Sequence, residues 1–190
     1  MSRSSASDLV LDESSHVYRW RGRVVPGLTE ILRSAGMIVS RGSEADLTRG
    51  SAVHLATRFY DEGRLDWTTV DRRITGYVQS WIALRRLTGL VTLWIERSVY
   101  CRAFGFATTL DRRVALNGRS VLLEIKTGHP EAWVGAQLEG HKLATGVDDE
   151  TLVARLHEDG SVASLIRMGG TADRAVLMGA IARYHWERQL

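Results

Sequence analysis

The sequence predicts a single α/β domain in which a central mixed β-sheet is flanked by helices. A length of 190 residues suits one domain with a buried core. Helical periodicity dominates as far as residue 87, β-rich segments follow from residue 92, and helices and strands then alternate to the C-terminus. The dipeptide Asn117-Gly118 between two β-rich segments indicates a hairpin. We expect the domain to span residues 1–190, with residues 1–15 forming a loose N-terminal segment.

The first half of the chain is expected to hold a short hairpin and then helices. Arg21-Gly22-Arg23 has the composition of a tight turn, and Pro26-Gly27 ends the β pattern. Thr29 is expected to cap the first helix, and the longest helix carries apolar residues at helical spacing. The expected elements are strands over 16–20 and 24–25 and helices over 30–34, 43–62 and 70–87.

The second half is expected to supply the main sheet. Alternating β-branched and aromatic residues predict its first strand, and Asp159-Gly160 indicates a second hairpin. Pro130 precedes one helix, and Thr171 is expected to cap the last. The expected strands cover 92–100, 106–116, 120–126, 151–157 and 161–167, and the expected helices cover 131–145 and 171–187.

Composition excludes several classes of protein. No stretch approaches the roughly 18 apolar residues of a membrane span, and the N-terminus lacks the apolar core of a secretory signal, so no membrane partner is expected. Cys101 is the only cysteine, which excludes an internal disulfide and a thiolate metal cluster and favours a cytoplasmic setting. A net charge of +3 does not by itself indicate a nucleic-acid ligand.

Lysine is almost absent, and its position is informative. Of 25 Lys and Arg residues, only Lys126 and Lys142 are lysine. Lys126 follows Glu124 by two residues in a hydrophobic run. Lysine is a compact point charge, whereas arginine is a wide planar fork, so a site that places a small cation beside a carboxylate would require lysine here.

Two acids and this lysine form the candidate catalytic group. Residues two apart on a strand share a face, so Glu124 and Lys126 point the same way and Ile125 points into the core. The hairpin through residues 117–118 lays the strand of Asp111 alongside. We expect Mg²⁺ or Mn²⁺ between Asp111, Glu124 and the backbone carbonyl of Ile125, because hard cations prefer oxygen ligands. An exposed, salt-bridged hairpin is the alternative explanation.

Other side chains are candidates for the same site. His54 lies on a predicted helix, and a neutral imidazole is a good metal ligand. Gln137 and His141 are four residues apart on one helix face that follows Lys126, where they would contact a phosphate or nucleotide. Glu96, on the preceding strand, is a candidate accessory acid. For each of these the alternative is an ordinary packed or solvated side chain.

Two further residues are candidates for contacts to DNA. Trp133 near the start of the same helix is a candidate base-stacking platform, with core packing as the alternative. Arg112, in the pair Arg112-Arg113, is a candidate phosphate contact, with a solvated face as the alternative.

In order and spacing, these motifs resemble the RecB-like branch of the PD-(D/E)XK nuclease superfamily. The matching segments are Gly50-x-x-x-His54, residues 105–111 ending in Asp111, Leu123-Glu124-Ile125-Lys126-Thr127-Gly128, and Gln137-x-x-x-His141. The segment from His16 to Thr29 is similar to the N-terminal hairpin and helix of phage and bacterial members. The family usually has tyrosine where this chain has His141.

The resemblance implies a restriction-endonuclease-like core and a Mg²⁺- or Mn²⁺-dependent deoxyribonuclease, often an exonuclease in recombination, repair or phage DNA processing. It implies that Asp111, Glu124 and His54 are metal ligands, that Lys126 is the catalytic lysine and that Gln137 is the helix glutamine. DNA is then the substrate, with a helicase or single-strand annealing protein as a candidate partner, in the cytoplasm of a bacterial or phage-infected cell. The alternatives are a non-cleaving DNA-binding or assembly module with the same fold, and an RNA or nucleotide phosphodiesterase.

Overall fold

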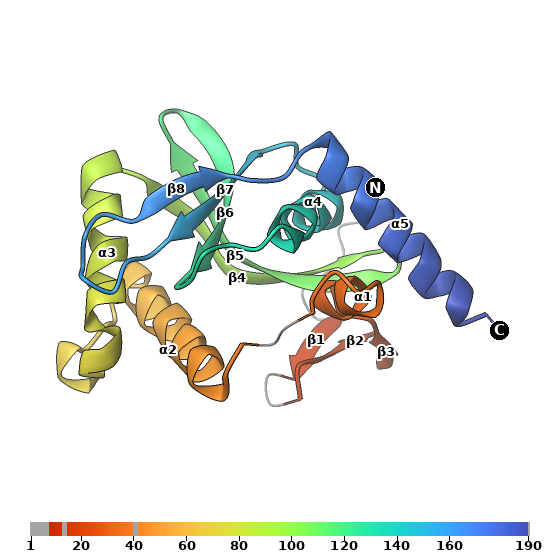
Figure 1. Ribbon diagram of the computed structural model, residues 1–190, viewed down its shortest axis with the longest axis horizontal. Helices are drawn as coiled ribbons and strands as arrows, with labels where there is room; N and C mark the ends of the chain where they lie inside the picture. The colour runs from red at the N-terminus through yellow and green to blue at the C-terminus, as the bar shows by residue number, and fades with distance from the viewer. Residues whose placement is uncertain (1–7, 13–14, 40–41, 190) are drawn as a thin grey trace.

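The large sheet of the protein is mixed, as predicted. The computed structural model describes residues 8–12, 15–39 and 42–189. In the large sheet, β6 and β7 are parallel and the other neighbours are antiparallel, in the order β4-β5-β6-β7-β8 (Figure 1). Its strands are β4 (Val91–Cys101), β5 (Phe106–Leu116), β6 (Arg119–Lys126), β7 (Glu150–Arg155) and β8 (Ser164–Arg167).

A smaller antiparallel sheet lies beside the end of β4 and β5. It contains β1 (Leu9–Asp12), β2 (Val17–Trp20) and β3 (Arg23–Val25), in sequence order. The expectation that residues 1–15 form a loose segment is wrong for β1, because Leu9–Asp12 pairs in full with β2. Residues 1–7 and 13–14 lie outside the described part of the chain.

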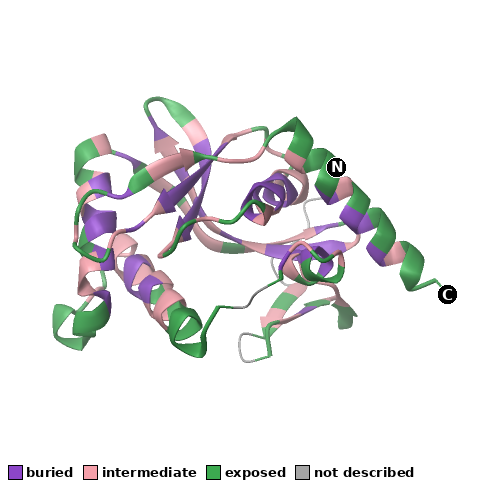
Figure 2. Cartoon of the chain, in the orientation of Figure 1, coloured by how far each residue is buried: buried purple, intermediate pink, exposed green. Residues whose placement is uncertain are grey.

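Helices cover both faces of the large sheet. On one face, α2 and α3 pack against β5, β6 and β7 through a core that includes Val53, Trp81 and Leu123. On the other, Val134 and Leu138 of α4 pack against Val153, and Figure 2 shows α4 as one of the most buried helices. The helices are α1 (Leu28–Ser34), α2 (Glu44–Asp61), α3 (Arg72–Thr88), α4 (Trp133–Thr145) and α5 (Thr171–Glu187), with a 3₁₀ turn at Trp67–Thr69.

Residue alternation along β6 decides which side chains reach the candidate site. Val121, Leu123 and Ile125 lie in the core formed with α2 and α3. The intervening Glu124 therefore points to the opposite face of the sheet, together with Lys126. The turn before β6 is the expected one, because Asn117 and Gly118 have φ values of 50° and 75°, which suit a two-residue hairpin.

Helix α4 is held at close range by its neighbours. A Cβ atom added at Gly135 would lie 2.6 Å from the Asp173 carboxyl carbon, and one added at Gly140 would lie 2.5 Å from Leu28 Cδ2. Glycine at these positions lets α4 approach α5 and α1. The face of α4 that is turned to β6 is fixed as a result.

The boundaries of three helices differ from the sequence expectation. The α1 helix begins at Leu28 after Gly27, without a side-chain cap from Thr29. The α3 helix begins two residues later than expected, because the Asp71 side chain caps it by accepting from the Arg73 N–H. The α4 helix begins at Trp133 instead of residue 131. By contrast, α2 begins after Ser43 as expected, with a capping box between Ser43 and Asp46.

Strands β7 and β8 are antiparallel but shorter than expected. The predicted hairpin around Asp159-Gly160 is an irregular connection that leaves the sheet and packs on α3. The His157 backbone N–H donates to Ser80 Oγ at 3.0 Å. A Cβ atom at Gly76 would overlap the Glu158 carbonyl, at 1.6 Å. These contacts draw the connection away from strand pairing.

None of the helices in the described residues is both long enough and apolar enough to span a membrane.

Candidate active site

Strands β5 and β6 separate at one point, and a side chain bridges them there. Their backbone pairing ends at Arg112 and Leu123. The preceding residue on β5 is Asp111, whose Oδ2 accepts a hydrogen bond from the Ile125 backbone N–H at 2.8 Å. A carboxylate thus replaces the backbone acceptor that β5 would have supplied. Because N–H and C=O of one strand residue face the same neighbouring strand, the Ile125 carbonyl also faces Asp111.

Glu124 and Lys126 meet on the face of β6 that α4 covers. Lys126 Nζ donates to Glu124 Oε1 at 3.0 Å. The Glu124 side chain is 4% exposed and that of Lys126 25% exposed. Burial alone would lower the pKa of Lys126, but the carboxylates of Glu124 and Asp111 outweigh it and raise that pKa. Lys126 is therefore a stable cation at neutral pH and not a proton acceptor.

Asp111 is a carboxyl group in an environment that opposes its charge. Burial raises the pKa of Asp111, although Lys126, the Ile125 N–H and Arg112 favour the ionised form. Glu96 contributes to the rise by charge repulsion. A cation that neutralised these acids would relieve this opposition.

Glu96 completes a row of acids across three strands. Ile95 pairs with Arg112 and Arg97 with Leu110, so Glu96 lies opposite Asp111. Its backbone is left-handed, with φ of 42°, which is uncommon for a residue other than glycine. The charge of Glu96 repels that of Asp111 and is one cause of the raised pKa of Asp111. Arg58 partly offsets this repulsion, since its Nη1 donates to Glu96 Oε2 at 2.9 Å.

His54 reaches the row of acids from α2. Its Nδ1 lies 3.5 Å from Asp111 Oδ1. Burial lowers the pKa of His54, and the charge of Glu124 only partly opposes this. The ring is therefore neutral near pH 7, which is the form that binds metal ions.

Helix α4 lines the other side of Glu124 and Lys126. Trp133, Gln137 and His141 are spaced four residues apart and share one helix face. Lys126 Nζ lies 5.3 Å from the Trp133 ring centroid, a cation–π distance. His141 Nδ1 lies 3.9 Å from Glu124 Oε2, and burial lowers the pKa of His141. The α4 face thus contacts the acidic and basic groups of β6 directly.

Several buried polar atoms of Glu124 and of the α4 face have no hydrogen-bond partner among the residues that the structure describes. They are Glu124 Oε2, Trp133 Nε1, Gln137 Oε1 and His141 Nε2. Buried polar atoms are nearly always paired, and an unpaired one costs about 1–3 kcal/mol. A water molecule or another polar group bound here would satisfy these atoms.

The side chains around Asp111 offer an incomplete set of ligands for a divalent ion. Within the described ranges, no group of three or more His, Cys, Asp or Glu side chains is gathered tightly enough to hold a metal ion by itself. Asp111 Oδ1, Glu124 Oε2 and the Ile125 carbonyl are nevertheless hard oxygen donors, of the kind that Mg²⁺ and Mn²⁺ bind with water completing the shell. The residues therefore fit an ion that is partly water-ligated, and do not form a closed protein cage.

Two side chains that we expected to contact DNA, Arg112 and His141, are buried, so these two predictions are wrong. Arg112 is 0% exposed, and its Nε donates to Asp61 Oδ2 at 2.7 Å. It therefore belongs to a buried ion pair and does not face a phosphate. His141 is 1% exposed and contacts Glu124 instead of the surface. Trp133 is half-buried with its ring beside Lys126, and its role as a stacking platform stays a prediction.

Sequence reasoning missed the residues that hold α2 against the site. Arg58 holds Glu96, and Asp61 accepts from Trp81 Nε1 at 2.9 Å as well as from Arg85 and Arg112. Asp61 lies 51 residues before Arg112 in the chain. The only local signal was the helical spacing of His54, Arg58 and Asp61, which places them near one face of α2.

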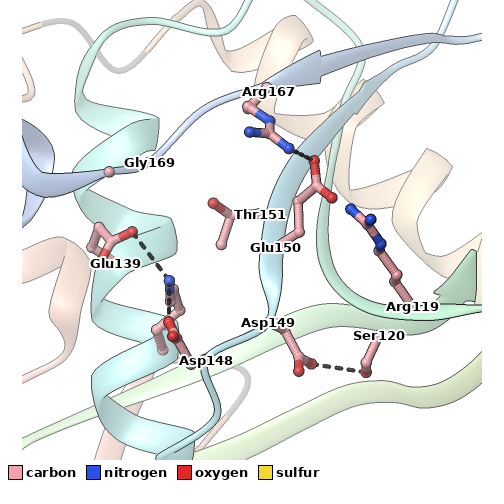
Figure 3. A pocket seen from close by; sticks show the side chains of 11 residues that line it. Arg119, Ser120, Glu139, Asp148, Asp149, Glu150, Thr151, Arg167 and Gly169 are labelled. Atoms are coloured by element: carbon pink, nitrogen blue, oxygen red, sulfur yellow. Dashed lines mark hydrogen bonds and ion pairs between the residues drawn. The ribbon is translucent and has the colours of Figure 1, made fainter.

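A pocket of about 610 Å³ opens at the other end of β6 and β7 (Figure 3). Ser120 and Thr151 line it near the strand starts, and Ser120 is about 20 Å along the strand from Lys126. Most of its charges are already paired, including Arg167 with Glu150 and Lys142 with Asp148. It is a separate feature from the row of acids.

Comparisons with known proteins do not identify a family. No family model matches the chain, and no curated protein is significantly similar to it. A solved structure titled "Crystal structure of SSO0001" is 15% identical over 82% of this chain and 81% of that chain, with a TM-score of 0.34. A similarity this weak carries no argument about fold or function.

Proposed function

We propose that the protein is a metal-dependent deoxyribonuclease of the PD-(D/E)XK type, related to its RecB-like branch. The observation that carries the proposal is the meeting of Asp111, Glu124 and Lys126 where β5 and β6 separate. Glu96 and His54 adjoin the same point. Acids beside one lysine at a strand separation suit phosphodiester hydrolysis, which requires both a cation site and stabilisation of negative charge.

The protein side chains have distinct roles in this proposal. Asp111, Glu124, the Ile125 carbonyl and His54 would hold Mg²⁺ or Mn²⁺. When bound, the ion polarises the phosphate and lowers the pKa of an attacking water. Lys126, which remains charged, stabilises the negative charge that develops on the phosphate. The water oxygen forms a bond to phosphorus as the bond from phosphorus to the leaving sugar oxygen breaks.

The α4 residues position the reacting groups. Gln137 shares a helix face with Trp133 and His141, and its buried side-chain oxygen has no hydrogen-bond partner in the described ranges. His141 lies against the second oxygen of Glu124 and limits the directions in which that carboxylate can turn. Trp133 lies against Lys126 and restricts its ammonium group. We infer that these contacts hold Glu124 and Lys126 in the geometry that the reaction requires.

The proposed substrate is DNA, cut from an end, in the cytoplasm of a bacterial or phage-infected cell. A helicase or annealing protein that supplies single strands is the proposed kind of partner. The resemblance of the motifs supports the substrate, the cutting from an end, the setting and the partner. Comparing linear with circular DNA tests whether the protein cuts DNA from an end.

The decisive experiment compares the two lysines of the chain. Linear duplex, linear single-stranded and circular DNA are incubated with Mg²⁺, Mn²⁺ or EDTA. Lys126→Ala should slow cleavage by about 100-fold or more, the loss expected when a charge-stabilising group is removed. Lys142→Ala is the matched control, because Lys142 pairs with the exposed Asp148. Cleavage that persists in EDTA, or equal rates for the two variants, would contradict the proposal.

A further inference from the structure

An aromatic stack at the small sheet holds two arginines in place. Trp20 at the end of β2 stacks on Tyr100 of β4, with ring centroids 4.8 Å apart and an angle of 22° between the planes. The guanidinium carbons of Arg21 and Arg102 lie 5.4 Å and 4.9 Å from the Trp20 centroid. Cation–π contacts of this kind limit where a guanidinium group can move.

A third arginine lies on the same face. Arg23 pairs with Trp20 across β2 and β3, and directly opposed strand residues point to one side of a sheet. Arg21, Arg23 and Arg102 are all exposed. We call these three arginines, with Trp20 and Tyr100, the arginine platform.

The platform has more positive than negative charge. Arg21 pairs with Asp8 at 3.2 Å. Arg23 and Arg102 form no ion pair with an acidic side chain in the part of the chain that the structure describes. Elsewhere in the fold, exposed arginines such as Arg73 and Arg183 have acidic partners close by in sequence, whereas Arg72 and Arg86 have no ion pair among the described residues, so the aromatic stack is what sets the platform apart. Two exposed guanidinium groups without such partners, Arg102 over the Trp20 ring and Arg23 on the same sheet face, are suited to an anionic ligand.

The platform is tied to the strand that carries Asp111. Tyr100 pairs with Ala107, which precedes Asp111 by four residues on β5. At about 3.3 Å per residue, the platform lies roughly 13 Å along the strand from Asp111. The Tyr18 hydroxyl is hydrogen-bonded to Thr109 Oγ1 at 2.9 Å and fixes β2 to β5 between these two points. Figure 1 shows the small sheet beside α1 along this edge of the fold.

We propose that the arginine platform binds the phosphate backbone of DNA a few nucleotides from the bond that is cut. This inference rests on the proposed function. Phosphates of one DNA strand follow one another at about 3.4 Å along a duplex, so 13 Å corresponds to roughly four of them. The planar fork of arginine matches phosphate oxygens, and Arg21 and Arg102, held over the Trp20 ring, lose little freedom on binding. Contacts of this kind position DNA and do not read its sequence.

The first experiment measures binding apart from cleavage. Fluorescence anisotropy follows a labelled duplex with a single-stranded end and the Lys126→Ala protein in EDTA, across a series of salt concentrations. Adding Arg23→Ala and Arg102→Ala should weaken binding about tenfold or more and reduce the magnitude of the salt slope by about 2, since each phosphate contact contributes about 0.9. The matched control is Arg72→Ala with Arg86→Ala on α3, which removes the same charge from exposed arginines elsewhere.

The results have distinct meanings. Affinity and salt slope equal to those of the control pair would overturn the inference. Equal binding of poly-glutamate and of DNA at matched charge would also overturn it, in favour of an acidic protein partner. Thermal melts of all variants check that folding is unchanged, and Arg102→Glu, which reverses the charge at one position, should weaken binding further than Arg102→Ala.

A small substrate separates this inference from the proposed function. Bis(p-nitrophenyl) phosphate is too short to reach from Asp111 to the platform. Protein with Arg23→Ala and Arg102→Ala but an intact Lys126 should hydrolyse it at the wild-type rate, while cleaving dilute DNA about tenfold more slowly. If wild-type protein hydrolyses neither substrate, the proposed function fails. The binding measurement then still decides whether the platform holds DNA.

Discussion

Arg112 Nε donates to Asp61 Oδ2 at 2.7 Å, and neither side chain is exposed. The other oxygen of Asp61 accepts from Trp81 Nε1 and from Arg85. One carboxylate therefore joins α2, α3 and β5 directly beneath the candidate site. Trp81, Arg85 and Arg112 all donate to this single acid, and Arg112 also donates to the Asp111 carbonyl and to Thr57 Oγ1.

Removal of Asp61 should be strongly destabilising. Asp61→Ala leaves the buried Arg112 charge without its acidic partner, and breaking a buried ion pair in this way costs about 3–5 kcal/mol of unfolding free energy. Urea denaturation measures the loss. Glu187→Ala, which breaks the exposed pair with Arg183, is the control and should cost less than about 1 kcal/mol. A loss at Asp61 as small as that of the control would show that the network is not structurally important.

Asp111→Asn and Asp111→Ala should differ in stability but not in activity. The asparagine oxygen can still accept from the Ile125 N–H, whereas alanine leaves that buried donor unpaired, at a cost of about 1–3 kcal/mol. Both variants should lose cleavage, because both lose the charge. Urea denaturation in EDTA gives the stabilities. Equal unfolding free energies would mean that the side-chain bridge between β5 and β6 contributes nothing.

The left-handed backbone at Glu96 predicts a reversed order of stability. Glycine in a strand is normally less stable than alanine, but only glycine adopts φ of 42° without strain. Glu96→Gly should therefore be more stable than Glu96→Ala, by about 1 kcal/mol. Both lack the carboxylate that Arg58 holds, so that loss cancels in the comparison. Thermal denaturation of the two variants checks the order, and the usual order would argue against a strained backbone.

His54→Ala should weaken binding of Mn²⁺ without unfolding the protein. The His54 ring faces Asp111 at 3.5 Å, and loss of a metal-site ligand or its support typically costs 10- to 100-fold in affinity. Isothermal titration calorimetry with Mn²⁺ measures this directly. His157→Ala is the control, because His157 is bonded to Ser164 outside the site. Identical Mn²⁺ affinities for the two variants would remove His54 from the metal site.

The protein should lose stability at alkaline pH as Tyr184 ionises. Burial and the hydrogen bond to Glu30 raise the pKa of Tyr184 from 10.0 to about 12. Its contribution is therefore complete below pH 10 and is lost between pH 10 and 12, where the unfolded chain ionises first. Tyr184→Phe should lose less unfolding free energy than the wild type between pH 9 and pH 11, as measured with urea. The same loss in both proteins would contradict the assignment.

Much of the fold could be predicted because its signals are local. The Asn117-Gly118 hairpin and the apolar stripe around Trp81 are written in short stretches of sequence. Strand β1 was missed because Leu9–Asp12 is too short to show alternation and gains its stability by pairing with β2. The Asp159-Gly160 turn signal predicts a hairpin after β7, whereas contacts with Ser80 of α3, distant in the sequence, decide the path of this connection.

In the candidate site, too, local features could be predicted from the sequence, and features that depend on distant residues could not. The common direction of Glu124 and Lys126 follows from strand alternation alone. The burial of Arg112 could not be foreseen, because its partner Asp61 is on another element and a charged strand residue is ordinarily exposed. Glu96 opposite Asp111 depends on an irregular backbone that no sequence pattern specifies.

The backbone N–H of Ile125 donates a hydrogen bond to the Asp111 carboxylate and not to a backbone carbonyl of β5. The NMR resonance of this amide proton should therefore shift when Asp111 is protonated or when a cation binds to it. The Ile125 amide is thus a spectroscopic reporter inside the candidate site that requires no added probe. Titrating the protein with Mg²⁺ while following that resonance would reveal occupancy before any substrate is present.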